Sequence, residues 1–374
     1  TEHNLDAFVV PSTDPHQSEY PPARFQSRAW LTGFNGSAGT VVVTREHVGL
    51  WTDSRYFIAA ATAIEGTEIV LHKLHAPGVD DYPRWLTANL VSGSRIGVDG
   101  RVVTESRYKQ LIAITEPYEL SVVDTDDPFE RIWRDRPELP AAPVFVLDET
   151  IAGETPTTKL KRIRREMTRV GARGHIVGAL DDIAWILNLR GSDVAYNPVF
   201  VAYLIVEEQS AVLYTAQTRI DSAVERYLKT HNVEVAPYSD FWAALQSITE
   251  PVLVDPERTS HAIAVAVSTR RRFEHTQPST GMKAHKNETE LSHLRSTMRR
   301  DGAAVVRFLK RFDDRVASGD EFDELEAITM LQSERETIPD YVGDSFNYIS
   351  AYNEHGAIVH YSVDKGSSAV VRKP

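Results

Sequence analysis

The sequence contains no cysteine. Without thiols the chain cannot form a disulfide framework, a thiolate zinc site, a cysteine nucleophile or an iron–sulfur cluster. It also lacks any apolar run near the roughly 20 residues that are needed to cross a bilayer. Residues 1–6 lack the basic and apolar pattern of a signal peptide. Together these absences predict a soluble, cytoplasmic protein with no membrane partner.

The sequence also has no excess of basic residues. The 41 Lys and Arg residues face 53 Asp and Glu residues, which gives a formal net charge of −12 at pH 7. Because affinity for polyphosphates comes mainly from clustered Lys and Arg, this balance excludes a general nucleic-acid binder. The content of 42% hydrophobic and 25% charged residues is typical of a globular protein. A length of 374 residues suggests two or three domains.

Two stretches interrupt the periodic patterning of the chain. Residues 136–143 contain three prolines, which disfavour helix and indicate an extended linker. Residues 275–281 are polar and rich in helix breakers, which indicates a second boundary. The sequence therefore predicts three domains, formed by residues 1–140, 145–275 and 280–374.

Both early domains mix strands with helices. Short runs of β-branched and aromatic residues that end in turn signals predict a hairpin over 199–206 and 211–214, and further strands at 6–11 and 40–44. Apolar residues at helical spacing predict a helix that Thr158 caps and that Gly171 or Gly174 ends. The series of strand, helix and hairpin occurs once in each half of this region. We interpret it as two copies of one α/β unit, so the predicted fold class is α/β.

The third segment begins with a long amphipathic helix. Asn287 and Glu290 have the spacing of a capping box. One face of this helix carries the apolar residues Leu291, Leu294, Met298, Val305, Leu309 and Phe312. We expect a second helix over 321–332 and strands at 345–350 and 356–361. Two helices followed by a sheet that is just beginning predict an incomplete domain.

Several residues could carry chemistry, and each also has a structural interpretation. His72 and His75 could bind a metal, but no carboxylate lies beside them, which favours structural or solvent-facing roles. The glycine-rich residues 33–39 match neither a P-loop nor a dinucleotide motif, so we expect a tight loop. Asp193 could stabilise a turn without any role in catalysis.

Arg55 and His360 each have both a structural and a functional interpretation. Arg55 lies between aromatic residues after an expected strand, where it could be a surface ion pair or could grip a carboxylate or peptide carbonyl. His360 ends an apolar run, where it could move a proton, stabilise an oxyanion or have a structural role.

Many of these segments match the motifs of one known family. In order and spacing they resemble the cytosolic three-domain Xaa-Pro aminopeptidases, also called aminopeptidase P, which are metallopeptidases related to creatinase and methionine aminopeptidase. The resemblance covers nearly the whole chain, and the residues that carry it are 6–12, 16–20, 36–40, 51–57, 132–137, 182–193, 197–200, 281–288, 300–304 and 356–361.

The resemblance implies a fold, an activity and a set of cofactors. It implies two creatinase-like N-terminal α/β domains, followed by the start of a pita-bread α+β catalytic domain. Family members remove the N-terminal residue from peptides whose second residue is proline. They use a water activated by two divalent metals, usually Mn²⁺, held by two Asp, one His and two Glu. The resemblance also implies a cytoplasmic homodimer, with Arg55 binding substrate and His360 acting as a catalytic and substrate-binding residue.

The sequence departs from the family pattern in its metal ligands. In the family these ligands follow the histidine that His360 matches, and beyond His360 this sequence has a single carboxylate, Asp364. We therefore expect no metal ligand and no bound cofactor in these 374 residues, which would be an inactive N-terminal piece of an enzyme. The alternative hypothesis is a non-catalytic module that binds peptides or proteins, as in pita-bread relatives that have lost their metals.

Overall fold

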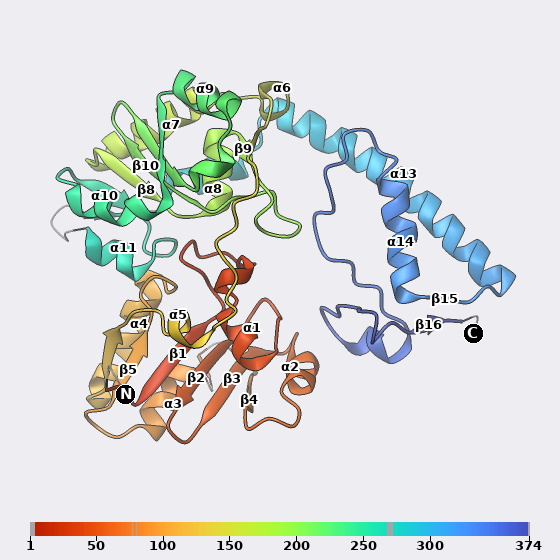
Figure 1. Cartoon of the computed structure of the whole chain (residues 1–374), viewed down its shortest axis with the longest axis horizontal. Coiled ribbons are helices and arrows are strands. Elements are labelled where there is room, and N and C mark those ends of the chain that lie inside the picture. Colours follow the sequence, from red (N-terminus) through yellow and green to blue (C-terminus); the bar gives the residue numbers. More distant parts are fainter. Residues whose placement is uncertain (1–3, 77, 80, 268–271, 373–374) are drawn as a thin grey trace. The chain divides into compact units, whose positions relative to one another are not determined.

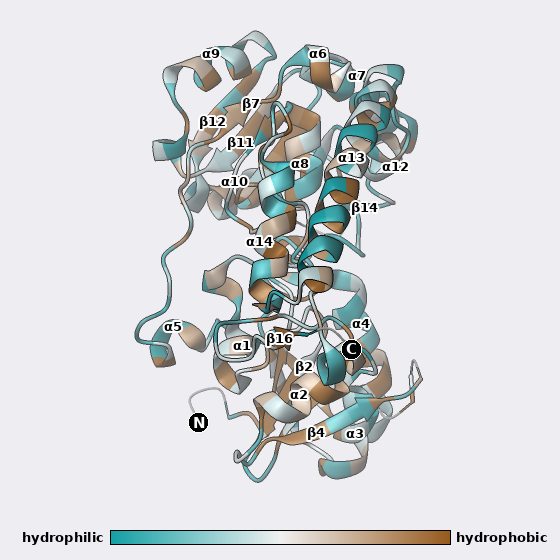
Figure 2. Ribbon diagram, turned by 90° about the vertical axis from the view of Figure 1, so that its right-hand side faces the viewer, coloured by the Kyte–Doolittle hydropathy of each residue, from teal (hydrophilic) through white to brown (hydrophobic). Residues whose placement is uncertain are grey.

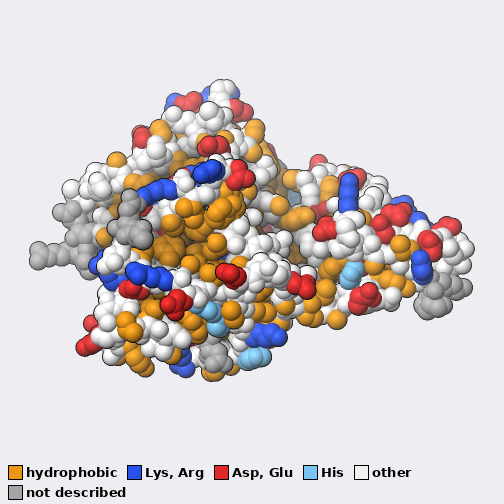
Figure 3. Space-filling view, turned by 60° about the horizontal axis from the view of Figure 1, so that its bottom comes forward, with side chains coloured by type: hydrophobic (Ala, Val, Ile, Leu, Met, Phe, Trp, Pro, Cys, Tyr) orange, Lys and Arg blue, Asp and Glu red, His pale blue; other side chains and the backbone are white. Residues whose placement is uncertain are grey.

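The computed structural model describes residues 4–76, 78–79, 81–267 and 272–372. The chain divides into two compact units, Thr1–His285 and Lys286–Pro374, and each is described by itself (Figure 1). Among the described residues, no helix has the length and apolar character needed to span a bilayer. On the face shown in Figure 3, acidic and basic side chains are interspersed and do not form a basic patch.

The first half of the first unit is built on a six-stranded mixed sheet. Its strands lie in the order β4-β3-β2-β1-β5-β6, and β2 runs antiparallel to both β1 and β3 while the other pairs are parallel. The strands are β1 (Ala7–Pro11), β2 (Thr40–Thr44), β3 (Val48–Asp53), β4 (Val70–Leu74), β5 (Arg95–Val98) and β6 (Ser121–Asp124). The α-helices are α1 (Ser27–Thr32), α2 (Phe57–Ala63), α3 (Tyr82–Asn89), α4 (Glu105–Thr115) and α5 (Phe129–Ile132).

The second half repeats this topology. Its strands lie in the order β12-β11-β10-β8-β13-β14, and again an antiparallel hairpin is flanked by parallel strands. The two expected copies of one α/β unit are therefore confirmed. The strands are β8 (Gly174–Val177), β10 (Ala202–Glu207), β11 (Ala211–Thr215), β12 (Val233–Pro237), β13 (Val252–Val254) and β14 (Arg272–Glu274), with a separate pair formed by β7 (Phe145–Val146) and β9 (Leu189–Arg190).

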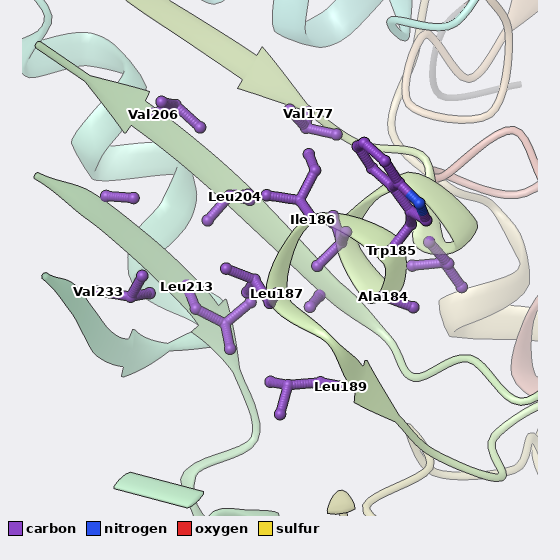
Figure 4. Close-up of a cluster of buried hydrophobic side chains, with 14 of the residues drawn as sticks. Val177, Ala184, Trp185, Ile186, Leu187, Leu189, Leu204, Val206, Leu213 and Val233 are labelled. Carbon is purple, nitrogen blue, oxygen red and sulfur yellow. The ribbon is translucent and has the colours of Figure 1, made fainter. Parts of the chain in front are cut away.

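Seven α-helices accompany the second sheet within the described residues. They are α6 (Glu149–Ala152), α7 (Pro156–Val170), α8 (Leu180–Leu187), α9 (Ser222–Thr230), α10 (Phe241–Ser247), α11 (His261–Ala266) and α12 (Pro278–Ala284). In Figure 4, Ile186 and Leu187 of α8 point toward Leu204 and Leu213 of the hairpin strands. All four side chains are fully buried. Because each buried side chain of this size contributes about 1.5–3 kcal/mol, this packing is a main source of stability.

Two local predictions for this half need correction. Thr155 caps α7 in place of Thr158, because its side chain accepts the backbone N–H of Thr158 and Pro156 occupies the first helical turn, where no N–H is needed. Gly171 ends the helix in the left-handed region (φ 83°), as expected. The strand predicted from residue 199 begins at Ala202, because residues 199 and 201 bond instead to the turn at Asp193.

Buried polar contacts join the two halves of the first unit. The carboxylate of Glu105 lies 2.7 Å from His261 Nδ1 and 3.3 Å from Arg272 Nη2 of the second half. Burial opposes ionisation of Glu105, but hydrogen bonds from His261 and Lys109 outweigh it and lower its pKa. At a second contact, His16 Nδ1 lies 2.9 Å from the carbonyl oxygen of Gly178.

A buried ion pair holds the extended linker against the turn at Asp193. Arg219 Nη1 donates to Asp193 Oδ2 at 2.7 Å, and both side chains are fully inaccessible to solvent. Arg219 Nη2 donates to the carbonyl of Pro140 in the extended linker, and Asp193 Oδ2 also accepts the backbone N–H of Val201. Asp193 therefore stabilises the turn, as its sequence position predicts, and the same pair anchors the linker.

Within its described residues, the second unit contains two α-helices, α13 (Glu288–Ser318) and α14 (Glu324–Arg335). The capping box of Asn287 and Glu290 is confirmed at the start of α13. In Figure 2 apolar residues recur along this largely hydrophilic helix, yet Leu294 and Met298 are 52% and 60% exposed. The apolar face is therefore present, but the second unit leaves much of it in contact with solvent.

The strands predicted at 345–350 and 356–361 are wrong. The described structure of this segment consists of turns and a 3₁₀ helix, Asn353–Ala357. A strand needs a neighbour to satisfy its backbone groups, and the pairing found in this unit joins the two-residue strands β15 (Phe322–Asp323) and β16 (Val370–Val371). The segment instead bonds to itself through local turns, such as the bond from the Tyr361 N–H to the Ile358 carbonyl.

A single carboxylate organises this irregular segment. Glu324 is fully buried and accepts hydrogen bonds from the backbone N–H groups of Tyr352 at 2.6 Å and Ala369 at 3.0 Å. It also binds His355 Nδ1 at 2.9 Å and the Tyr361 hydroxyl at 3.0 Å. Burial raises the pKa of Glu324, but these hydrogen bonds outweigh burial and hold the pKa below its usual value.

We predict that Asp193→Ala lowers the free energy of unfolding by about 3–5 kcal/mol, because it leaves the Arg219 guanidinium buried without a counter-ion. Urea unfolding followed by circular dichroism measures this change. Glu225→Ala removes the acid of an exposed pair with Lys229 and is expected to cost less than about 1 kcal/mol. Equal effects of the two substitutions would contradict the prediction.

We also predict that acid selectively opens the segment around Glu324. Its folded-state pKa lies below the unfolded value, so its stabilisation is complete above about pH 4.5 and is lost as pH falls through the folded-state value. Hydrogen exchange of residues 352–369 should therefore accelerate between pH 5 and pH 3 relative to a fully exposed reference peptide. Glu324→Gln should show the fast exchange already at pH 7, whereas Glu321→Gln, at an exposed carboxylate, should behave as the original chain.

Candidate functional site

A cavity of about 320 Å³ lies at the carboxyl ends of strands β1, β3 and β5 of the first sheet. This edge is where α/β sheets usually bind ligands, because loops diverge there and leave polar groups accessible. Helices α3 and α4 contribute Tyr82 and Arg107 to its wall. The polar residues that line it from the strand ends and the glycine-rich loop are Ser12, Thr13, Ser37, Thr40, Thr52 and Asp53.

The glycine-rich loop rests directly on two aromatic rings. A Cβ on Gly36 would lie 2.4 Å from Phe34 Cζ and 2.7 Å from Tyr56 Cδ1, so only glycine fits. The Tyr56 hydroxyl accepts the backbone N–H of Ser37 at 3.2 Å and lies 2.9 Å from Ser37 Oγ. Gly33 adopts φ 71° where α1 ends. The expected tight loop is therefore confirmed, and it brings Ser37 to the cavity.

Arg55 follows β3 two residues after Asp53, which lines the cavity, but Arg55 is not itself a lining residue. Its Nε and Nη2 donate to the two carboxylate oxygens of Asp53, each at 2.8 Å, and its guanidinium lies 5.1 Å from the centre of the Tyr56 ring. The hydrogen bonds that Arg55 donates to Asp53 raise its pKa further above its usual value, and a guanidinium is charged at every physiological pH. The side chain is 44% exposed. This is a fixed cation, two of whose five donors hold it in place.

A second cationic residue, Arg28, lies beneath the glycine-rich loop. It is 6% exposed, donates to the carbonyl of Gly36, and has Nε and Nη1 atoms without a hydrogen-bond partner within the described residues. Burial lowers its pKa to about 10. It lines a smaller hollow of about 80 Å³ together with Glu19 and Tyr20. The burial of Arg28 could not be predicted from the sequence, because nothing in its local pattern distinguishes a buried arginine from a surface one.

The other sequence candidates lie elsewhere. His72 lies within β4 and stacks on Trp51, whereas His75 follows the strand and contacts the Phe57 ring, so the two histidines do not form one site. His360 lies in the second unit and has φ 57° in a turn, not at a strand end as predicted. Among the described residues, no group of three or more His, Cys, Asp or Glu could hold a metal ion.

Comparison with known proteins identifies the two repeated halves. The family described as creatinase/prolidase N-terminal domain matches residues 1–132, and a second family of the same description matches residues 135–290. The two halves of the first unit are therefore similar to creatinase/prolidase N-terminal domains. These matches confirm the creatinase-like α/β fold that the sequence motifs imply.

This chain is similar along its whole length to proteins named Xaa-Pro aminopeptidase. It is 33% identical over 387 residues to Xaa-Pro aminopeptidase 1 of Dictyostelium discoideum, in an alignment that covers 100% of this chain and 61% of that protein. It is also 33% identical to a probable Xaa-Pro aminopeptidase P of Laccaria bicolor, over 100% of this chain and 59% of that protein. The chain thus spans about three fifths of the length of these relatives.

A solved structure also agrees with the fold. The X-prolyl aminopeptidase of Caenorhabditis elegans, described as a cytosolic enzyme with a di-nuclear active site, superposes with a TM-score of 0.94 at 29% identity. The superposition covers 98% of this chain and 62% of that protein. The resemblance to Xaa-Pro aminopeptidases is therefore confirmed.

We predict that Gly36→Ala disturbs the candidate site. The added methyl group must displace the Phe34 or Tyr56 ring, and overpacking of this kind costs about 1–3 kcal/mol. Thermal unfolding should shift to lower temperature, and the environment of Tyr56 should change in near-ultraviolet circular dichroism. Gly302→Ala is the matched control, since its Cβ would meet no atom within 4 Å. An unchanged melting temperature for Gly36→Ala would refute the prediction.

Proposed function

We propose that these 374 residues are part of an enzyme that removes the N-terminal residue from peptides with proline in the second position. The observation that carries the proposal is the match across 98–100% of this chain to relatives named Xaa-Pro or X-prolyl aminopeptidase. In the intact protein we propose a cytoplasmic homodimer. We further propose that residues 1–140 and 145–275 are its creatinase-like domains and that residues 280–374 begin its pita-bread catalytic domain.

We propose that the 374 residues alone do not hydrolyse peptides. The Caenorhabditis elegans relative is described as having a di-nuclear active site. The family resemblance implies two Mn²⁺ ions, but no cluster of candidate ligands occurs among the described residues. The side chains in the described ranges therefore do not fit such a centre, and no catalytic step is assigned to them through a metal.

Arg55 is proposed to bind the peptide substrate. Asp53 holds the guanidinium by two hydrogen bonds, so little side-chain entropy is lost when the remaining donors meet a carbonyl or carboxylate. The charge persists at all relevant pH values because the pKa of Arg55 is raised. His360 is proposed as the residue of the second unit that contacts substrate at the reacting bond, where an imidazole can donate or accept a proton.

The experiment compares this chain with a version extended by the metal-ligand region of its own coding sequence. Both are assayed with Mn²⁺ and a peptide that begins with an Xaa-Pro pair. We expect release of the first residue by the extended protein and none by the 374 residues. In the extended protein, Arg55→Met should lower kcat/KM by roughly 10- to 100-fold, mainly through KM, since a charge-assisted hydrogen bond contributes about 1.5–3 kcal/mol.

Two controls make this result specific. Arg95→Met removes an exposed arginine at the start of β5 and should leave kcat/KM unchanged. A peptide that has alanine instead of proline at its second position should not be cleaved. Clear activity of the 374 residues alone would contradict the proposed incompleteness. Peptide binding without turnover by the extended protein would instead support a non-catalytic interaction module.

A further inference from the structure

The cavity of about 320 Å³ lies where the chain diverges across the first sheet. After β1 the chain passes through α1 to β2 on one side, whereas after β5 it passes through α4 to β6 on the other side. Because the two connections diverge, a crevice stays open between the carboxyl ends of β1 and β5, and open α/β sheets bind ligands in such crevices. Its volume lies within the range of about 300–1,000 Å³ that is usual for small-molecule sites.

Part of the cavity wall is apolar and belongs to the core. Val9, Trp51, Val98 and Leu111 line the cavity, and each is at most 3% exposed. They are members of the cluster of buried side chains that joins the first sheet to α3 and α4. Packing therefore sets this surface before any ligand arrives, and it favours a ligand with an apolar part.

Three hydroxyl groups on the wall are available to a ligand. They belong to Ser12, Thr40 and Tyr82, which are half-buried and have no side-chain hydrogen bond within the described residues. The hydroxyl of Thr52, by contrast, donates to the carbonyl of Ala38 at 2.7 Å and stabilises the glycine-rich loop. A ligand can therefore bond to these three hydroxyl groups without breaking a contact of the fold.

The charged side chains among the described lining residues are Asp53 and Arg107. Both carboxylate oxygens of Asp53 accept hydrogen bonds from Arg55, each at 2.8 Å, so the charge of Asp53 is compensated. Arg107 is exposed and forms no ion pair with any residue that the structure describes. Burial raises the pKa of Tyr82, and the positive charge of Arg107 opposes this rise, so the guanidinium acts on the Tyr82 hydroxyl. The wall thus presents one uncompensated cation.

We propose that this cavity binds a small organic carboxylate, with the anionic group held by Arg107 and Tyr82 and the apolar part against the buried wall. A guanidinium can donate two parallel hydrogen bonds to a carboxylate, whose single charge it matches. A phosphate dianion would carry more charge than one arginine compensates. The site goes beyond the proposed aminopeptidase activity, because it requires no metal and Arg55 does not line it.

The test is a titration of the 374-residue chain at pH 7.5, followed by saturation-transfer NMR of the ligand. The probes are benzoate and its neutral analogue benzamide. We expect benzoate to bind saturably and at least about tenfold more tightly than benzamide, because the amide cannot form the charge-assisted hydrogen bonds to Arg107. Inorganic phosphate at equal concentration should not displace benzoate.

Variants of Arg107 locate the binding. Arg107→Met should weaken benzoate binding at least about tenfold and leave benzamide binding unchanged, whereas Arg107→Lys should keep part of the preference for benzoate. Arg95→Met is the matched control, since it removes an exposed arginine at the other end of β5. Circular dichroism shows whether each variant is folded.

Three results would each overturn the proposal: no saturable binding of benzoate, equal affinity for benzamide, or unchanged benzoate affinity in Arg107→Met. Displacement of benzoate by phosphate would contradict the proposed ligand class. If Arg107→Met does not fold, crystals of the unaltered chain soaked in 4-bromobenzoate decide the question. A bromine anomalous peak inside the cavity supports the site, and peaks only at other positions refute it.

Discussion

The buried carboxylate of Glu105 is the interaction on which the first unit depends. It stands at the start of α4, beside the first sheet, and its partners His261 and Arg272 come from the second half. Removal of this buried carboxylate would leave His261 Nδ1 without its partner and Arg272 with the partly exposed Glu274. The contacts of Glu105 therefore hold α4 of the first half against α11 and β14 of the second half.

Much of the fold follows from local patterns in the sequence. The strand at 40–44 and the hairpin that contains 211–214 consist of short runs of β-branched and other apolar residues. The capping box at Asn287 is a pattern of four residues. Residues 345–350 and 356–361 carry the same kind of run but form no strand. Strand formation depends on a partner as well as on propensity, and a single run cannot reveal whether the partner is present.

Some features of the candidate site could likewise be predicted from the sequence, and others could not. The tight loop at Gly36 was accessible from sequence because residues 33–39 are rich in glycine, whereas the proposed role of Arg55 came from the family resemblance and not from its local pattern. Arg107 and Arg28 were not accessible, since their surroundings arise from the packing of α4 on the sheet and from burial beneath a loop. Their roles depend on distances that only the folded chain defines.

The repeated topology also explains why the two sheets differ in use. Gly178 follows β8 at the position that Ser12 occupies after β1 in the first sheet, and Tyr238 follows β12. In the second copy this edge is filled, because the imidazole of His16 from the first copy bonds to both Gly178 and Tyr238. The carboxyl edge of the second sheet is therefore occupied by His16 of the first copy, whereas the same edge of the first sheet keeps the cavity that Ser12 lines.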